Sequence, residues 1–126
     1  MLNFIMSIKN KEILQSFLDE IMKISFGKGF SGFFYRNRVN VIICLLISIS
    51  SKEDKEIGFE DLCSYIPGFT TSRSTIKSVL DYAVKEKYFI KSKSLLDNRK
   101  STYIPSSITR IFLTKWIERN KEIFQD

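Results

Sequence analysis

The chain has 126 residues, of which 44% are hydrophobic and 27% charged, a balance that suits one folded domain and excludes a disordered chain. It contains no histidine, which removes the usual general base at neutral pH and argues against an enzyme. The 20 Lys and Arg outnumber the 14 Asp and Glu, giving a formal net charge of +6.

Features that would place the chain outside the cytoplasm are not evident. The N-terminal residues lack the basic start, long apolar core and cleavage site of a signal peptide. The most apolar run, residues 41–47, is too short to span a bilayer. The two cysteines, Cys44 and Cys63, have no CxxC spacing, and without histidine a Cys/His zinc site is excluded. We expect a cytoplasmic protein with no membrane contact, metal or cofactor, and with both thiols buried and reduced.

The first predicted element is a helix that Asn10 caps and that runs to about residue 26. Its apolar residues recur at the spacing of one helical face, with Asp19 and Glu20 on the opposite side. Residues 27–35 then mix glycines with aromatic residues. We expect this segment to be a linker whose aromatic side chains pack under the domain rather than line a ligand pocket.

Residues 37–50 fit two structures. Their many β-branched residues favour a strand. A run of this length that is apolar nearly all round also fits a buried central helix. We predict a helix, because the elements that follow form a unit that needs a core helix here. Residues 51–56 are predicted to be a charged loop, with at most a very short strand at residues 57–58.

Residues 59–87 predict two helices joined by a turn. The first, residues 59–65, is stopped by the Pro-Gly pair at 67–68. The second is capped by a hydroxyl residue at 70–72 and runs to about Lys87. The second helix has a regular apolar stripe: Ile76, Val79, Leu80, Ala83 and Val84.

A basic hairpin and a last helix complete the chain. Residues 88–93 and 101–104 alternate weakly around a turn, which predicts two strands, and this hairpin is called the wing. Ser107 caps a final helix to about Phe124. The predicted fold class is therefore mostly α with a small β-hairpin (α+β). It is a winged helix-turn-helix with N- and C-terminal dimerisation helices.

We expect residues 1–126 to form one domain. Residues 1–35 supply the first helix and the aromatic linker, residues 36–105 the winged helix-turn-helix core, and residues 106–126 the last helix. The positive charge is not spread evenly over these parts. Residues 71–110 hold nine basic and three acidic side chains, and so carry the whole net charge of +6. A cationic footprint confined to the second helix and the wing is what phosphate binding requires.

The second helix of the pair, called the recognition helix, is predicted to contact DNA bases. Small and hydrogen-bonding residues at its N-terminal end let the backbone approach base edges. Arg73 can bond guanine O6 and N7 in bidentate fashion. The alternative that the hydroxyl residues only cap the helix stays open. The predicted contacts are Thr71, Ser72, Arg73, Ser74, Thr75, Lys77 and Ser78.

The wing is predicted to contact the adjacent backbone and minor groove. Arg99 at the hairpin tip suits the strong negative potential of a narrow minor groove. The wing lysines are expected to touch phosphates, which adds affinity without sequence information. The predicted wing contacts are Lys91, Lys93, Asp97, Asn98, Arg99 and Lys100.

The two terminal helices carry more apolar surface than one small domain needs, so we expect a homodimer. A simple monomeric core is the alternative use of the same faces. The predicted interface residues are Phe17, Ile21, Ile111, Phe112 and Trp116.

The wing sequence 97–99, Asp-Asn-Arg, followed after a strand by Pro105-Ser106, resembles the signature of the MarR family of winged-helix regulators. Residues 72–80 and 88–90 are similar to the family's recognition helix and its exit into the wing. The resemblance implies a homodimer built from terminal helices that binds a palindromic operator. It also implies that Arg99 enters the minor groove while Asp97 holds a nearby arginine in place.

The sequence therefore predicts a dimeric, MarR-like transcription regulator that binds double-stranded DNA sequence-specifically. Two alternatives stay open: a winged-helix protein-protein interaction module, and a replication or partition accessory protein that uses the same DNA-binding unit. The basic, Ser/Thr-rich face favours DNA over a protein partner, since a docking face would expose more apolar residues. No polar constellation indicates a small-molecule effector.

Overall fold

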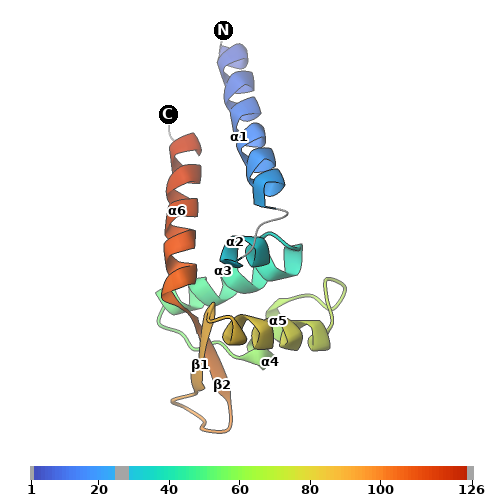
Figure 1. Cartoon of the computed structure of the whole chain (residues 1–126), viewed down its shortest axis with the longest axis vertical. Helices are drawn as coiled ribbons and strands as arrows, with labels where there is room; N and C mark the ends of the chain where they lie inside the picture. The colour runs from blue at the N-terminus through green and yellow to red at the C-terminus, as the bar shows by residue number, and fades with distance from the viewer. Residues whose placement is uncertain (1, 25–28, 125–126) are drawn as a thin grey trace.

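The computed structural model describes residues 2–24 and 29–124, which form six helices and one two-stranded hairpin (Figure 1). In chain order these are α1 (Leu2–Ile24), α2 (Gly29–Phe34), α3 (Arg38–Lys52), α4 (Phe59–Tyr65), α5 (Arg73–Lys85), β1 (Phe89–Lys93), β2 (Ser101–Pro105) and α6 (Ser107–Phe124). A helix-turn-helix pair, α4 and α5, leads directly into the hairpin. The predicted fold class, a mostly helical winged helix-turn-helix, is confirmed.

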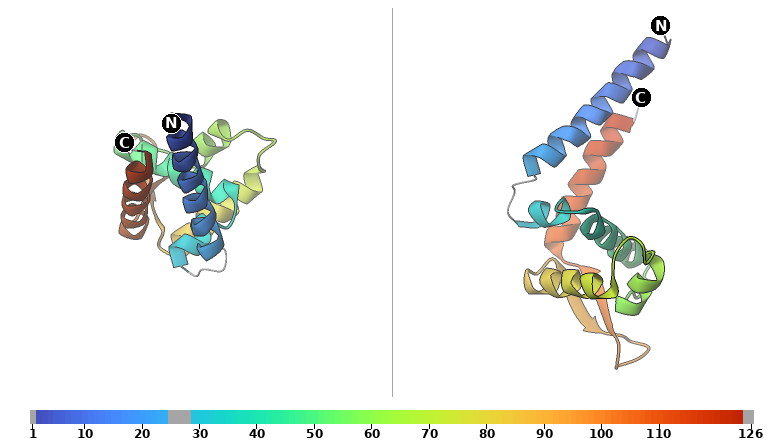
Figure 2. Two further views of the ribbon diagram at one scale, coloured as in Figure 1. Left: turned by 90° about the horizontal axis from the view of Figure 1, so that it is seen from above. Right: turned by 90° about the vertical axis from the view of Figure 1, so that its right-hand side faces the viewer.

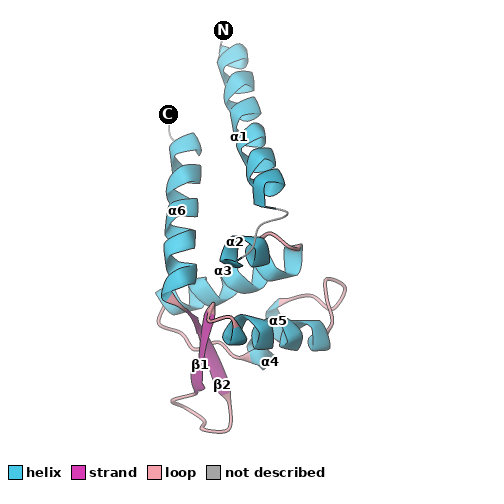
Figure 3. Cartoon of the chain, viewed as in Figure 1, coloured by secondary structure: helices cyan, strands magenta, loops and turns pink. Residues whose placement is uncertain are grey.

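The elements are arranged along one long axis. Both termini lie at one end, where α1 and α6 extend away from the rest of the molecule and contact each other (Figures 1 and 2). The wing forms the opposite end, with α5 beside it and α3 between α5 and the terminal helices (Figure 3). None of the helices within the described residues has the length and apolarity that crossing a membrane requires.

The ambiguous apolar run is a helix, α3, as predicted. The Asn37 side chain caps it by accepting a hydrogen bond of 2.9 Å from the backbone N–H of Asn40. Ile43, Cys44 and Ile47 are fully buried in the core. Burial on this face outweighs the β-branched preference for a strand, which is a weak local effect.

The prediction of an aromatic linker at residues 27–35 was only partly right, because Gly29–Phe34 forms the short helix α2. Its three phenylalanines are buried, so the prediction that they pack under the domain is confirmed. The Phe30 ring lies 4.9 Å from that of Phe112 on α6, and the Asn40 side chain donates a 2.8 Å hydrogen bond to the Phe33 carbonyl. Burying each phenylalanine contributes about 1.5–3 kcal/mol, more than the roughly 1 kcal/mol that a helical glycine costs.

The predicted start of the first helix was wrong. Helix α1 begins at Leu2 instead of after Asn10, because the preceding residues contain no glycine or proline and continue the helix. It ends at Ile24, and residues 25–26 lie outside the described part of the chain. No strand forms at residues 57–58, where the Ile57 carbonyl accepts a single 3.0 Å hydrogen bond from the Tyr103 N–H.

The wing is a regular antiparallel pair, with Phe89 opposite Pro105 and Lys93 opposite Ser101. Tyr103 on β2 is buried and ties the wing to the body together with the Ile57 hydrogen bond. Gly58 closes this junction, because a Cβ at that position would lie 2.7 Å from the Ser101 carbonyl oxygen. The wing is therefore held at a fixed place beside α4 and α5.

Candidate nucleic-acid interface

Helix α5 presents one buried and one exposed face. Ile76, Leu80 and Ala83 are buried in the core, as the apolar stripe predicted. The polar residues in its N-terminal half are exposed to solvent: Arg73, Ser74, Thr75, Lys77 and Ser78. Six of the seven predicted recognition-helix residues are thus exposed, and Thr71 is half-buried before the helix begins.

The hydroxyl residues at the start of α5 form a cap. Ser72 has an extended backbone, and its Oγ accepts a 3.1 Å hydrogen bond from the Thr75 N–H. The same oxygen lies 2.9 Å from the Thr75 Oγ1 and 3.1 Å from the Ser74 Oγ. The capping role considered for these residues is therefore real at Ser72, and it fixes the end of α5 that faces outward.

Arg73 is paired with a residue that the sequence did not indicate. Its Nη2 and Nη1 atoms donate to the two carboxylate oxygens of Glu60 on α4, at 2.6 and 3.1 Å. The guanidinium also lies 5.1 Å from the centre of the Phe59 ring. The hydrogen bonds from Arg73 lower the pKa of Glu60, and Glu60 raises the pKa of Arg73. A bidentate clamp between α4 and α5 thus holds the predicted base-reading side chain.

The wing tip, residues 94–100, is organised by Asp97. One carboxylate oxygen accepts hydrogen bonds from the backbone N–H and the Nε of Arg99, at 3.0 and 3.2 Å. These bonds lower the pKa of Asp97, the backbone bond having the larger effect. The Asp97 carbonyl also accepts a 2.9 Å bond from the Lys100 N–H. Asp97 therefore orients the Arg99 guanidinium through its Nε atom, while 91% of the side chain stays exposed to solvent.

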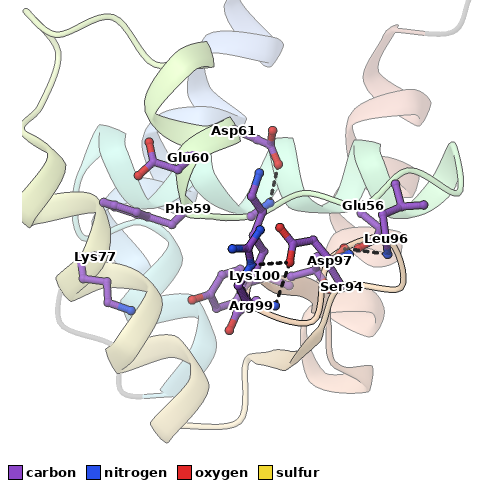
Figure 4. A pocket seen from close by; sticks show the side chains of 14 residues that line it. Glu56, Phe59, Glu60, Asp61, Lys77, Ser94, Leu96, Asp97, Arg99 and Lys100 are labelled. Atoms are coloured by element: carbon purple, nitrogen blue, oxygen red, sulfur yellow. Dashed lines mark hydrogen bonds and ion pairs between the residues drawn. The ribbon is translucent and has the colours of Figure 1, made fainter.

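A cleft of about 490 Å³ separates the wing tip from the N-terminal end of α4 (Figure 4). Three of its acidic side chains come from outside residues 71–110, so the local charge is more mixed than that segment indicates (Glu56, Glu60, Asp61). Each accepts a hydrogen bond: Glu56 from the Leu95 N–H at 3.1 Å, Asp61 from the Gly58 N–H at 2.8 Å, and Glu60 from Arg73.

The cations of the interface differ in their pairing. Lys77 lies 3.3 Å from Asp81, one turn along α5. Lys91, Lys93 and Lys100 form no ion pair with a described residue. The wing therefore supplies lysines available for phosphates, whereas Arg73 and Lys77 of α5 already have acidic partners.

The terminal helices place the predicted dimer residues in different surroundings. Ile111 is exposed, but the Phe112 ring packs against α2, and Trp116 lies 6.3 Å from the Phe34 ring. Phe17 is half-buried, and the Ile21 side chain lies outside the described part of the structure. The predicted interface did not include an exposed apolar stripe at four-residue spacing on α1: Leu14, Leu18 and Met22.

Both cysteines are free thiols. Cys44 is buried, as predicted, and desolvation raises the pKa of its thiol and keeps it protonated. Cys63 on α4 is only half-buried, because it sits at the edge of the apolar face of a short helix.

No family model and no curated protein matches this chain. Three solved structures do. A probable transcriptional regulator from Pseudomonas aeruginosa aligns at a TM-score of 0.55 and 18% identity, over 98% of this chain and 79% of that one. MarR aligns at a TM-score of 0.55 and 15% identity, over 97% of this chain and 77% of that one. The adhesin competence repressor AdcR from Streptococcus pyogenes aligns at a TM-score of 0.51 and 12% identity, over 89% of this chain and 73% of that one.

The shared fold is the winged helix-turn-helix. At these identities the similarity establishes the architecture of the chain, including the terminal helices, since nearly the whole chain is covered in two of the three alignments.

Proposed function

We propose that this protein is a MarR-like transcription regulator that binds double-stranded DNA sequence-specifically. The observation that carries the proposal is the placement of the polar face of α5 and the cationic wing beside each other, at the end opposite the termini. A helix and a hairpin in this arrangement span a major groove and the neighbouring minor groove. The likeness to MarR and to a repressor supports it.

In this proposal, α5 enters the major groove with its N-terminal half against the bases. Ser78 and Lys77 lie on the exposed face one turn beyond the cap. Arg73 reaches a guanine by exchanging the Glu60 carboxylate for the O6 and N7 acceptors, one bidentate partner for another. The exchange favours sites that offer a matching pair of acceptors, and it penalises those that do not.

The wing supplies the second contact. Arg99, oriented by Asp97, enters the minor groove, and Asn98 lies beside it at the tip. Lys91, Lys93 and Lys100 bind phosphates, and their contacts make the affinity fall with salt.

We infer that the protein acts as a homodimer joined through α1 and α6. The exposed apolar residues of α1 support this, with Leu14 69% and Met22 64% exposed in a single chain. Sedimentation should show a dimer that Leu14→Glu with Leu18→Glu converts to a folded monomer. Glu12→Lys, a charge change at an exposed position on another face of α1, should leave the dimer intact. A wild-type monomer at high protein concentration would contradict the inference.

Fluorescence anisotropy with random-sequence duplex DNA at two salt concentrations tests the proposed function. We expect salt-sensitive binding that Arg73→Ala with Arg99→Ala weakens by more than about tenfold, the loss of two charge-assisted contacts. The control removes two cations from the terminal helices, Lys11→Ala with Lys115→Ala, and should bind nearly as the wild type does. No binding at low salt would refute the proposal.

One observation favours the second candidate, a protein-interaction module. The wing tip exposes two leucines, Leu95 and Leu96, where a purely electrostatic contact with DNA needs none. If the duplex does not bind, this module becomes the better account. A replication or partition accessory protein would bind DNA through the same unit and would pass the same test.

A further inference from the structure

The wing tip carries the most exposed leucines among the described residues. Leu95 is 95% exposed and Leu96 is 92% exposed, and they are adjacent in the chain. Neither contributes to the core of this protein, and the two strands that lead to them are mostly polar on their exposed faces. A pair of almost fully exposed leucines in the loop of a basic hairpin indicates a contact with a partner.

The backbone that presents these leucines is fixed. The Leu95 N–H donates to the Glu56 carboxylate at 3.1 Å, and the N–H groups of Leu96 and Asp97 both donate to the Ser94 Oγ, at 3.1 and 3.2 Å. Ser94 is itself buried, and its N–H bonds the Lys100 carbonyl at 2.8 Å. The tip is therefore ordered by bonds to its main chain while both apolar side chains stay in solvent.

The wing that carries the pair is cationic. Lys93, Arg99 and Lys100 are exposed on this hairpin, and the carboxylates of Glu56 and Asp97 each accept hydrogen bonds from the tip. Taken alone, the two leucines would also suit a protein partner, but the centres of protein interfaces are depleted of charge, and this hairpin is not. Cations and leucines on one hairpin suit a duplex, in which phosphates flank a groove lined by sugars and base edges.

We propose that Leu95 and Leu96 form an apolar wedge that enters the minor groove beside Arg99 and partly unstacks one base step, bending the duplex. Apolar side chains inserted in this way kink DNA toward the major groove. The wedge favours pyrimidine–purine steps such as TA, which unstack most easily. This inference rests on the proposed function and adds to it a sequence preference at positions where the wing makes no base hydrogen bond.

The test compares the wild type with Leu95→Ser, Leu96→Ser on a short duplex rich in TA steps. Donor and acceptor dyes at the duplex ends report bending, 2-aminopurine in place of adenine reports unstacking, and anisotropy reports binding. Ile90→Ser, an exposed apolar residue at the base of the same wing, is the matched control. Because all three side chains are exposed, the variants should fold, which circular dichroism checks.

We expect the wild type and Ile90→Ser to raise both the energy transfer and the 2-aminopurine fluorescence. The double variant should keep salt-sensitive binding, weakened by no more than about tenfold, and lose both signals. Binding by the wild type without bending or unstacking, or equal bending by the double variant, overturns the wedge and leaves the proposed function standing. No duplex binding by the wild type at low salt overturns both.

Discussion

The molecule divides into a head, α2–α5 with the wing, and two terminal helices, α1 and α6, and the apolar residues of α1 are far less buried than those of the head. In the head, Leu62 of α4 and Leu80 of α5 are fully buried within the one chain. On α1, Leu14 and Met22 are mostly exposed, although they follow the same helical periodicity. The contrast teaches that periodicity predicts a helix in both places, but only the tertiary structure tells which stripe already has a partner.

The most exposed apolar residues of the head lie in its loops. Leu95 and Leu96 form the wing tip, and Phe69 lies in the turn before α5. The core of the head is therefore complete within one chain, and its most exposed apolar side chains lie in the wing and in the turn before α5, the elements proposed to contact DNA. This supports a division in which the head binds DNA and the terminal helices bind a second copy.

The largest expected effect tests the comparison itself. Leu80→Ala should lower the free energy of unfolding by about 2–5 kcal/mol, because it leaves a cavity in a fully buried site. Leu14→Ala should change it by less than about 0.5 kcal/mol at protein concentrations too low for association. Urea unfolding followed by circular dichroism measures both. Equal losses at the two positions would show that α1 is as integral to the single chain as α5.

The second prediction sharpens the view of the head as a rigid unit. Gly58→Ala should destabilise the protein by about 1–3 kcal/mol, because the new Cβ meets the backbone oxygen of Ser101 at 2.7 Å. Gly68→Ala is the control, since a Cβ there meets nothing within 4 Å. Chemical denaturation gives both values. If Gly58→Ala is as harmless as the control, the wing moves freely relative to α4.

The third prediction concerns the end of α5 that is proposed to face the DNA. Ser72→Ala should cost about 1 kcal/mol, because Ser72 accepts the hydrogen bond that caps the helix. Ser78→Ala, an exposed position inside the same helix, should be neutral or slightly stabilising. Thermal unfolding compares them. A larger loss at Ser78 would mean that its hydroxyl has a structural role.

The smallest expected effect is that of the exposed Glu60–Arg73 pair. Its hydrogen bonds hold the pKa of Glu60 below the ordinary value of about 4.3, so the charged form stabilises the fold above that pH and the contribution is lost as the pH falls through the lowered pKa. Glu60→Gln should therefore lower the melting temperature slightly at neutral pH, and the difference from the wild type should vanish in acid. A difference that persists in acid would have another cause.

Sequence patterns predicted the elements with strong periodicity and missed those set by tertiary contacts. The α5 stripe was correct because its amphipathic spacing is regular. The short helix α2 was missed, since it contains two glycines and is held by burial of its phenylalanines. The Arg73–Glu60 clamp joins residues 13 apart in the chain, a pairing that depends on how α4 meets α5.

Hydrogen exchange of the backbone amides, with and without duplex DNA at low salt, tests the central claim most directly. The account predicts that DNA slows exchange at the start of α5, residues 72–78, and at the wing tip, residues 94–100, while α1 and α6 are unaffected. Protection confined to the terminal helices, or absent everywhere, would contradict it.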